Sequence, residues 1–216
     1  GAEIRDSITR VLMLLPDFHF TPQRVLVDGP QVFVLAANRA SLGERALAWD
    51  AVYALTLAGD RIGAGRRYYD QAALVADTET FQVAASTVPP TNGDSPRGAP
   101  QDLAAIDLVT RADAWNRRDG TALAAPLGAV RLRMAGVARP LEHASDIDGA
   151  LAAFAGRSAG LRLAPGAVAR TADGMAIEWV GSVGSGAAAR RFALVELVTT
   201  SPEPPEWRLL FNTFGL

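Results

Sequence analysis

Apolar and polar residues alternate most clearly between Glu44 and Gln71, and this alternation predicts two long strands joined by a tight turn at Gly59-Asp60-Arg61. The first of these strands places an apolar set on one face: Leu47, Trp49, Ala51, Tyr53, Leu55 and Leu57. Its other face is mixed, and the return strand runs from Ile62 to Arg66-Arg67-Tyr68-Tyr69-Asp70. The pattern therefore predicts a hairpin with one apolar and one mixed face.

The segments before this hairpin follow two different periods. Apolar residues recur at helical spacing from Glu3 to Leu15, where Pro16 ends the predicted helix. Strands are predicted at Gln23–Asp28 and Gln31–Ala40, on either side of Asp28-Gly29-Pro30. The first half is thus predicted as one helix followed by about four antiparallel strands.

A stretch rich in Pro, Gly and Ser, residues 86–100, cannot pack and is predicted as a linker. After it we predict a helix at Gln101–Asn116, a short helix capped by Asp119, a strand around Val130–Met134, and a helix that Ser145 or Asp146 caps and that ends near Gly156. The remaining pattern predicts four strands, at Leu161–Arg170, Met175–Val183, Ala187–Thr200 and Glu206–Phe214. Both halves repeat a layout of helix and then strands, which is typical of an α+β protein.

Composition removes several classes of function. The net charge of −2 gives no basic excess for nucleic acid or an anionic membrane, and no apolar run is long enough to span a bilayer. The chain has no Cys, only two His, and all 21 of its basic residues are Arg. Thiolate metal sites, cysteine nucleophiles and lysine Schiff bases are therefore excluded. We expect a soluble, cytoplasmic protein with no metal and no cofactor.

Particular motifs resemble the nuclear transport factor 2-like superfamily, which includes SnoaL-like polyketide cyclases and ketosteroid isomerases. In the second half these are Ala114-Trp115-Asn116-Arg117-Arg118-Asp119-Gly120, the helix from Asp146 to Phe154, and the four strands after it. In the first half they are Leu15-Pro16-Asp17-Phe18 and the segment from Gly59 to Asp70. The resemblance covers most of the chain outside the linker.

The resemblance implies an α+β fold of two cone-shaped domains, each a curved antiparallel sheet packed with helices around an apolar pocket. Residues 1–85 would form a partial domain that lacks its N-terminal helices, and residues 101–216 a second domain. The two would pack as a pseudo-dimer within the chain, and a homodimer stays open as a further state.

The family's catalytic groups do not carry over. Counted from Asn116 and Asp119, the isomerases' oxyanion-donating Tyr falls on about Arg111, and their Asp base falls on about Arg133. The acid that cyclase-like relatives carry on the last strand of the first half falls on Arg67. Glu178 and Asp50 remain as candidate catalytic bases, although a solvated face is an equal alternative for Glu178.

Further residues are candidates for ligand binding, with packing as the alternative for the aromatic ones: Arg111, Trp115, Arg133, Trp179, Asn212, Trp49, Tyr53 and Arg67. A buried Arg would need an anionic partner, from Glu178, Glu196 or a ligand carboxylate. We therefore expect a protein that binds a small hydrophobic or weakly acidic ligand. A cyclase or isomerase that uses carboxylate acid/base chemistry, and a non-catalytic interaction module, are the alternatives.

Overall fold

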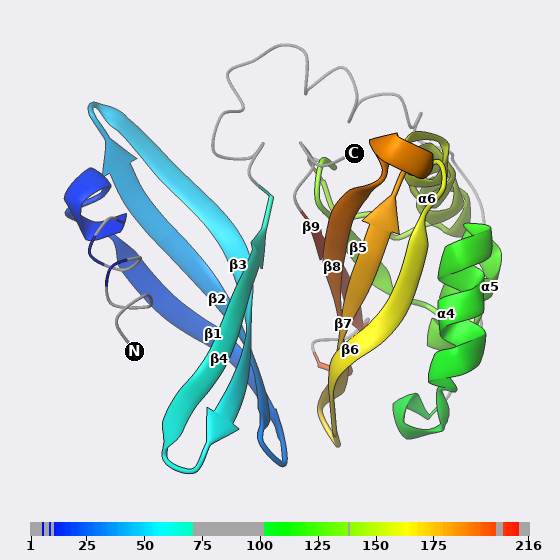
Figure 1. Ribbon diagram of the computed structural model, residues 1–216, viewed down its shortest axis with the longest axis horizontal. Coiled ribbons are helices and arrows are strands. Elements are labelled where there is room, and N and C mark those ends of the chain that lie inside the picture. Colours follow the sequence, from blue (N-terminus) through cyan, green and yellow to red (C-terminus); the bar gives the residue numbers. More distant parts are fainter. Residues whose placement is uncertain are drawn as a thin grey trace.

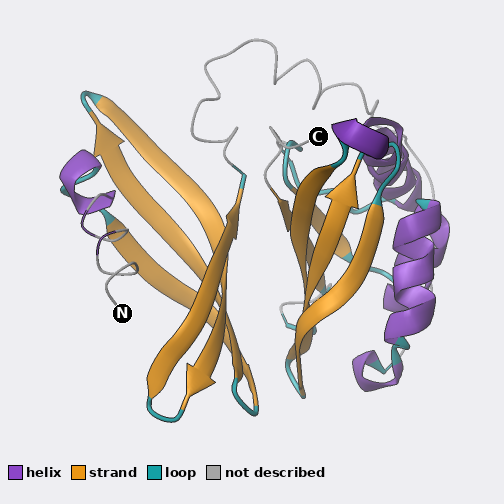
Figure 2. Ribbon diagram, viewed as in Figure 1, coloured by secondary structure: helices purple, strands orange, loops and turns teal. Residues whose placement is uncertain are grey.

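The computed structural model describes residues 6, 9, 11–70, 102–137, 139–201 and 205–211. It is an α+β structure in which two sheets face each other and helices cover the far side of the second sheet (Figures 1 and 2). The predicted linker at 86–100, the proposed boundary at 85 and Asn212 lie outside the described residues.

The N-terminal sheet is a meander of four antiparallel strands: β1 (His19–Asp28), β2 (Gln31–Leu42), β3 (Arg45–Ala58) and β4 (Arg61–Tyr69). Residues 11–14 before it are helical, as the spacing predicts. Gly59 adopts φ 65° in the β3–β4 turn, a conformation that glycine adopts without strain. The predicted hairpin is therefore confirmed, with an irregularity between Thr56 and Leu57.

The C-terminal sheet has the order β5-β9-β8-β7-β6. Its strands are β5 (Arg131–Met134), β6 (Arg162–Thr171), β7 (Gly174–Val183), β8 (Arg190–Thr199) and β9 (Glu206–Phe211). Strands β6 to β9 form an antiparallel meander, as predicted. The short strand β5 pairs parallel to β9, so the sheet is mixed and not purely antiparallel.

Three α-helices and short 3₁₀ turns accompany this second sheet. They are η1 (Leu103–Ala105), α4 (Leu108–Arg117), α5 (Gly120–Ala124), η2 (Ala125–Leu127), α6 (Ala144–Arg157) and η3 (Gly186–Ala188). Asp119 caps α5 as predicted, through a hydrogen bond from the Ala122 amide. Two boundaries were wrong: α4 begins only after its cap Asp107, and α6 begins after His143, with Asp146 buried inside its first turn.

The strands of the two meanders match in register. Asp28 opposes Gln31 in the first hairpin and Thr171 opposes Gly174 in the second, 143 positions later in both strands. The next pairings, Gln31 with Thr56 and Gly174 with Thr199, keep this separation. Both first strands are also irregular just after a proline, Pro22 in β1 and Pro165 in β6. Strands β1 to β3 and β6 to β8 therefore share one register, whereas the pairing of β9 with β8 differs by one residue from that of β4 with β3.

Two hydrophobic cores follow from this arrangement. One lies between the C-terminal sheet and its helices and contains the rings of Trp115, Phe154, Trp179, Trp207 and Phe211. The other lies between the two sheets and joins residues such as Phe33 and Val52 to Val195 and Leu197. Because side chains alternate along a strand, successive residues of β7 and β8 point toward one core and then the other.

Candidate functional site

The residues that sequence reasoning selected do not form one site, because they lie on three separate surfaces. Arg111, Trp115 and Trp179 belong to the helix side of the C-terminal sheet, whereas Glu178, Asp50 and Arg133 face the space between the sheets. Trp49, Tyr53 and Arg67 lie on the outer face of the N-terminal sheet. A sheet therefore separates Arg111 from Arg133, the two arginines expected in one pocket.

On the helix side, Arg111 and Glu196 form a buried ion pair. The Arg111 side chain is 2% exposed and the Glu196 side chain is fully buried. Arg111 Nε donates to Glu196 Oε2 at 2.9 Å, its Nη2 donates to Oε1, and Trp179 Nε1 donates to Oε2 at 3.0 Å. Arg111 Nη1 also donates to the Leu123 carbonyl at 2.9 Å. Glu196, one of the anionic partners proposed for a buried arginine, therefore pairs with Arg111. Arg111 needs no ligand carboxylate to balance its charge.

Glu178 lies between the sheets and is 2% exposed. Arg66 Nη1 donates to its Oε2 and the Tyr68 hydroxyl donates to its Oε1, each at 2.5 Å. Burial, and then the Glu178 carboxylate, raise the pKa of Tyr68 above its ordinary value. The hydrogen bond to Glu178 raises the pKa of Arg66. Since one of its carboxylate oxygens accepts from Arg66 and the other from Tyr68, Glu178 links the two sheets.

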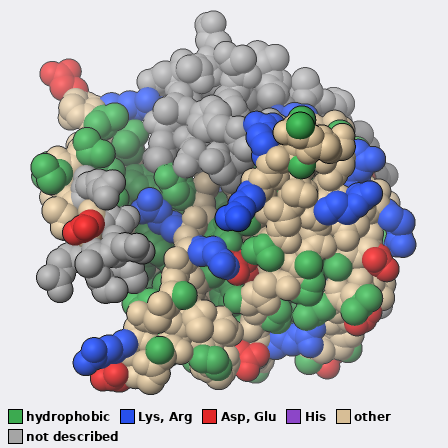
Figure 3. All heavy atoms as spheres, in the orientation of Figure 1, with side chains coloured by type: hydrophobic (Ala, Val, Ile, Leu, Met, Phe, Trp, Pro, Cys, Tyr) green, Lys and Arg blue, Asp and Glu red, His purple; other side chains and the backbone are tan. Residues whose placement is uncertain are grey.

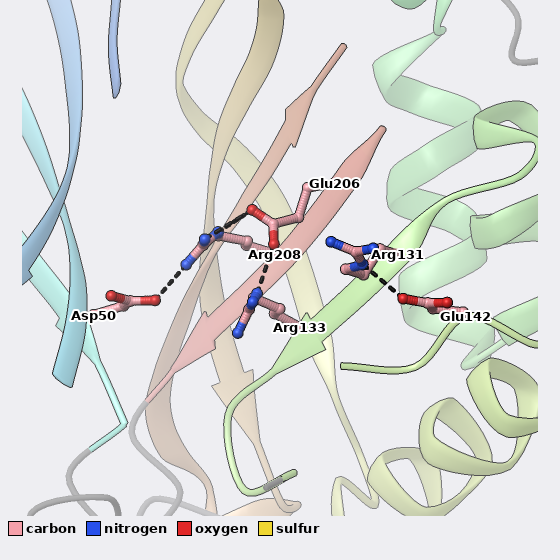
Figure 4. A network of polar contacts seen from close by, with 6 residues as sticks. All are labelled: Asp50, Arg131, Arg133, Glu142, Glu206 and Arg208. Carbon is pink, nitrogen blue, oxygen red and sulfur yellow. Dashed lines mark hydrogen bonds and ion pairs between the residues drawn. The ribbon is translucent and has the colours of Figure 1, made fainter. Parts of the chain in front are cut away.

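A second polar network connects β3, β9 and β5 (Figure 4). Arg208 Nη1 donates to Asp50 Oδ2 at 2.5 Å, and its Nε donates to Glu206 Oε2 at 2.8 Å. Arg133 Nε donates to the other oxygen of Glu206 at 2.6 Å. Asp50, the other candidate base, is therefore also paired with a cation.

The third surface is the outer face of the N-terminal sheet. Trp49 packs there with Ala40, Leu47 and Ala51, and its ring centroid lies 5.9 Å from that of Phe18. The guanidinium of Arg67 lies 4.9 Å from the centre of the Tyr69 ring. The Tyr53 hydroxyl donates to Asn38 Oδ1 at 3.3 Å, and burial raises the pKa of Tyr53. Packing accounts for Trp49.

A cavity of about 410 Å³ opens at one end of the helix side. Its walls are mainly apolar, from Leu103, Ala104, Leu127, Ala172, Val198 and Pro205. Arg170 on β6 also lines it, and donates through Nη2 to the Ile106 carbonyl at 2.7 Å. The Nε of Arg170 is buried and has no hydrogen-bond partner among the described residues. Asp102, Thr171 and Thr200 complete the lining, so the cavity combines a mainly apolar wall with one arginine and one carboxylate among the described residues.

Sequence reasoning missed Arg170, Arg208 and Glu206. Alternation along Glu206-Trp207-Arg208 already places the two charged residues on one face of a strand. The order of the chain does not reveal that β5 lies beside β9, because 71 residues lie between the end of β5 at Met134 and the start of β9 at Glu206. Arg170 lies one residue before the end of β6, and no motif in the sequence singles it out.

The described residues contain no cluster of three or more His, Cys, Asp or Glu that could hold a metal ion. Among the same residues no helix is long and apolar enough to cross a membrane. Comparison with models of known families, with curated proteins and with solved structures finds no significant match. The argument for function therefore depends on the geometry of this chain.

Proposed function

We propose that this chain is a tandem nuclear transport factor 2-like protein of the SnoaL-like type that binds a small, mainly apolar, weakly acidic molecule in the cavity beside Arg170. The equal registers of β1–β3 and β6–β8 support a duplicated unit, and the facing sheets support a pseudo-dimer within the chain.

The observation that carries the proposal is the side chain of Arg170 at the wall of a mainly apolar cavity of about 410 Å³. Ligand pockets typically combine this size, an apolar lining and a few polar groups that fix the orientation of the ligand. The guanidinium of Arg170 supplies a positive charge with which a ligand carboxylate can pair. The apolar walls would bury the rest of the ligand.

Other features of the chain favour binding over catalysis. A larger cavity, of about 510 Å³, lies beside Glu178 and Arg66, but those two groups already pair with each other. An acid/base cyclase needs a carboxylate without a basic partner, and both candidate bases, Glu178 and Asp50, are held by arginines. An interaction module without ligands would lack a cavity of ligand size, and the cavity beside Arg170 is large enough for one.

The test is a thermal-shift screen of medium-chain and aromatic carboxylic acids, each paired with its primary amide. We expect at least one acid to raise the melting temperature by several degrees at saturating concentration, and its amide to have a smaller effect. In Arg170→Gln the affinity for that acid should fall by about 10- to 100-fold, because a charge-assisted hydrogen bond is lost.

Arg61→Gln is the matched control, because the side chain of Arg61 is 87% exposed and lies in a turn far from the cavity lining. It should bind the acid as the unchanged chain does. If no acid in the panel shifts the melting temperature, or if Arg170→Gln binds as tightly as Arg61→Gln, the proposal is wrong.

A further inference from the structure

A separate cavity, of about 280 Å³, lies between the two sheets, and the described residues that line it include four arginines and one carboxylate. Arg24 comes from the N-terminal sheet, and Arg131, Arg133 and Arg208 come from the C-terminal sheet together with Glu206. Figure 3, drawn from one side of the molecule, shows arginine side chains in blue scattered among hydrophobic and acidic ones over that face. The cavity is therefore strongly cationic in a chain whose net charge is −2.

The pairing of strands brings two of these charges together. Arg133 on β5 stands directly opposite Arg208 on β9, and like charges at opposed positions of neighbouring strands destabilise a sheet. Glu206 offsets this repulsion by accepting from both arginines, through Oε1 and Oε2 (Figure 4). The single negative charge of Glu206 is thereby shared between two arginines and cannot balance both.

Outside the cavity, Asp50 accepts from Arg208 and Glu142 accepts from Arg131. When these two carboxylates are counted with Glu206, the group still has one more arginine than carboxylates. The fourth arginine, Arg24, donates to the carbonyl oxygen of Ser201, which carries no charge. Counted over the described residues, a net positive charge thus remains at the cavity.

Unused donors lie on β5. Arg131 and Arg133 each bond a carboxylate through Nε, and their terminal nitrogens make no hydrogen bond to the described residues. The two residues are two positions apart on one strand and so project from the same face, roughly 7 Å apart. Their side chains are 30% and 44% exposed, so both can be reached by a solute.

We propose that this arginine-lined cavity binds a small oxyanion that carries two negative charges, with Arg131 and Arg133 as its main donors. A planar guanidinium offers paired N–H groups that match the oxygens of a phosphate or carboxylate. The volume of 280 Å³ exceeds the roughly 30 Å³ share of one water several times over, which leaves room for a small organic anion and not for a polymer. The ligand has either a phosphate group or two carboxylates.

The test is isothermal titration calorimetry of the whole chain with inorganic phosphate and, separately, with succinate. The ionic strength is kept low, because salt screens the interaction of partly exposed charges. We expect one of the two anions to bind: stronger binding of phosphate assigns the site to a phosphate group, and stronger binding of succinate assigns it to paired carboxylates.

Arg131→Gln should weaken this binding about tenfold or more, because at least one charge-assisted hydrogen bond is lost. Arg24→Gln tests the opposite wall and, by removing one of the four charges, should also weaken binding without touching the β5–β9 ladder. Arg61→Gln is again the control and should bind the anion as before. Arg170→Gln should also leave anion binding unchanged, because Arg170 lines the other cavity.

Each variant is first checked by circular dichroism and thermal unfolding, and Arg24→Gln provides the measurement if Arg131→Gln does not fold. The proposal is overturned if neither anion binds to the unchanged chain. It is also overturned if a folded Arg131→Gln or Arg24→Gln variant binds the anion as tightly as Arg61→Gln does.

Discussion

Replacing Arg111 by Met tests whether the C-terminal core depends on its buried ion pair. The change removes the only described cation that pairs with Glu196 and leaves that carboxylate, whose side chain is fully buried, with Trp179 as its remaining described donor. Breaking a buried pair by removing one partner costs about 3–5 kcal/mol. In a chain of this length, that loss corresponds to a fall in melting temperature of roughly 6–20 °C.

The measurement is equilibrium unfolding in urea, followed by tryptophan fluorescence. Trp115, Trp179 and Trp207 are all buried in the same core as the pair, so their emission reports on its loss. Arg61→Met is the control and should leave the unfolding midpoint unchanged, because that side chain is 87% exposed.

A second replacement makes the test specific to charge. Glu196→Gln keeps an oxygen that can accept from Trp179 but removes the negative charge. The double variant Arg111→Met, Glu196→Gln should therefore be more stable than the sum of the two single losses predicts, by about 1–3 kcal/mol. Additive losses, or a loss below about 1 kcal/mol in Arg111→Met, would show that the pair is not what stabilises this core.

Two further predictions concern the sheets. Burial and Glu178 raise the pKa of Tyr68, so the stability that neutral Tyr68 contributes is complete below about pH 10 and is lost as the pH rises further; Glu178→Gln should lower that pKa, which absorbance titration against Tyr68→Phe would measure. A Cβ on Gly181 would lie 1.8 Å from the Arg162 carbonyl oxygen, so Gly181→Ala should cost at least about 1–3 kcal/mol in urea unfolding. The helix α6 offers a contrast to this sheet position. A Cβ added to Gly156 would meet no atom within 4 Å, so Gly156→Ala should raise the free energy of unfolding by about 0.5–1 kcal/mol.

Sequence periodicity predicts the individual elements of this protein well, because alternation and helical spacing are local properties. The β3 strand illustrates this: its two predicted faces are the observed ones as far as Thr56. Helix starts were less predictable, since Asp107 and Asp119 both cap helices through their side chains, whereas α6 begins after His143 without a side-chain cap. A polar residue near a helix start, such as Asp146, can instead be buried against a partner, here Arg139.

The candidate site was less predictable than the elements, because it depends on which strands become neighbours. Both faces of β3 are partly buried: Leu47, Trp49 and Ala51 of the apolar face form one core, and Val52 and Ala54 of the mixed face pack between the sheets. Asp50, also on the mixed face, reaches Arg208. The spacing of residues within one strand contains no information about such a partner from a distant segment. Arg133 and Arg208 in particular become neighbours only through the parallel pairing of β5 with β9.

The alternation of side chains also limits the chemistry that this sheet can perform. Neighbours in sequence, such as Glu178 and Trp179, face opposite cores, so they cannot serve one reacting group. On the helix side the buried carboxylate Glu196 is neutralised by Arg111, and between the sheets Glu178 is neutralised by Arg66. A proton-transfer site needs a carboxylate that is free to change its charge, whereas the unsatisfied polar group beside the 410 Å³ cavity is a cationic donor, Arg170 Nε. This distribution of paired and unpaired charges supports the proposal that the protein binds an anion.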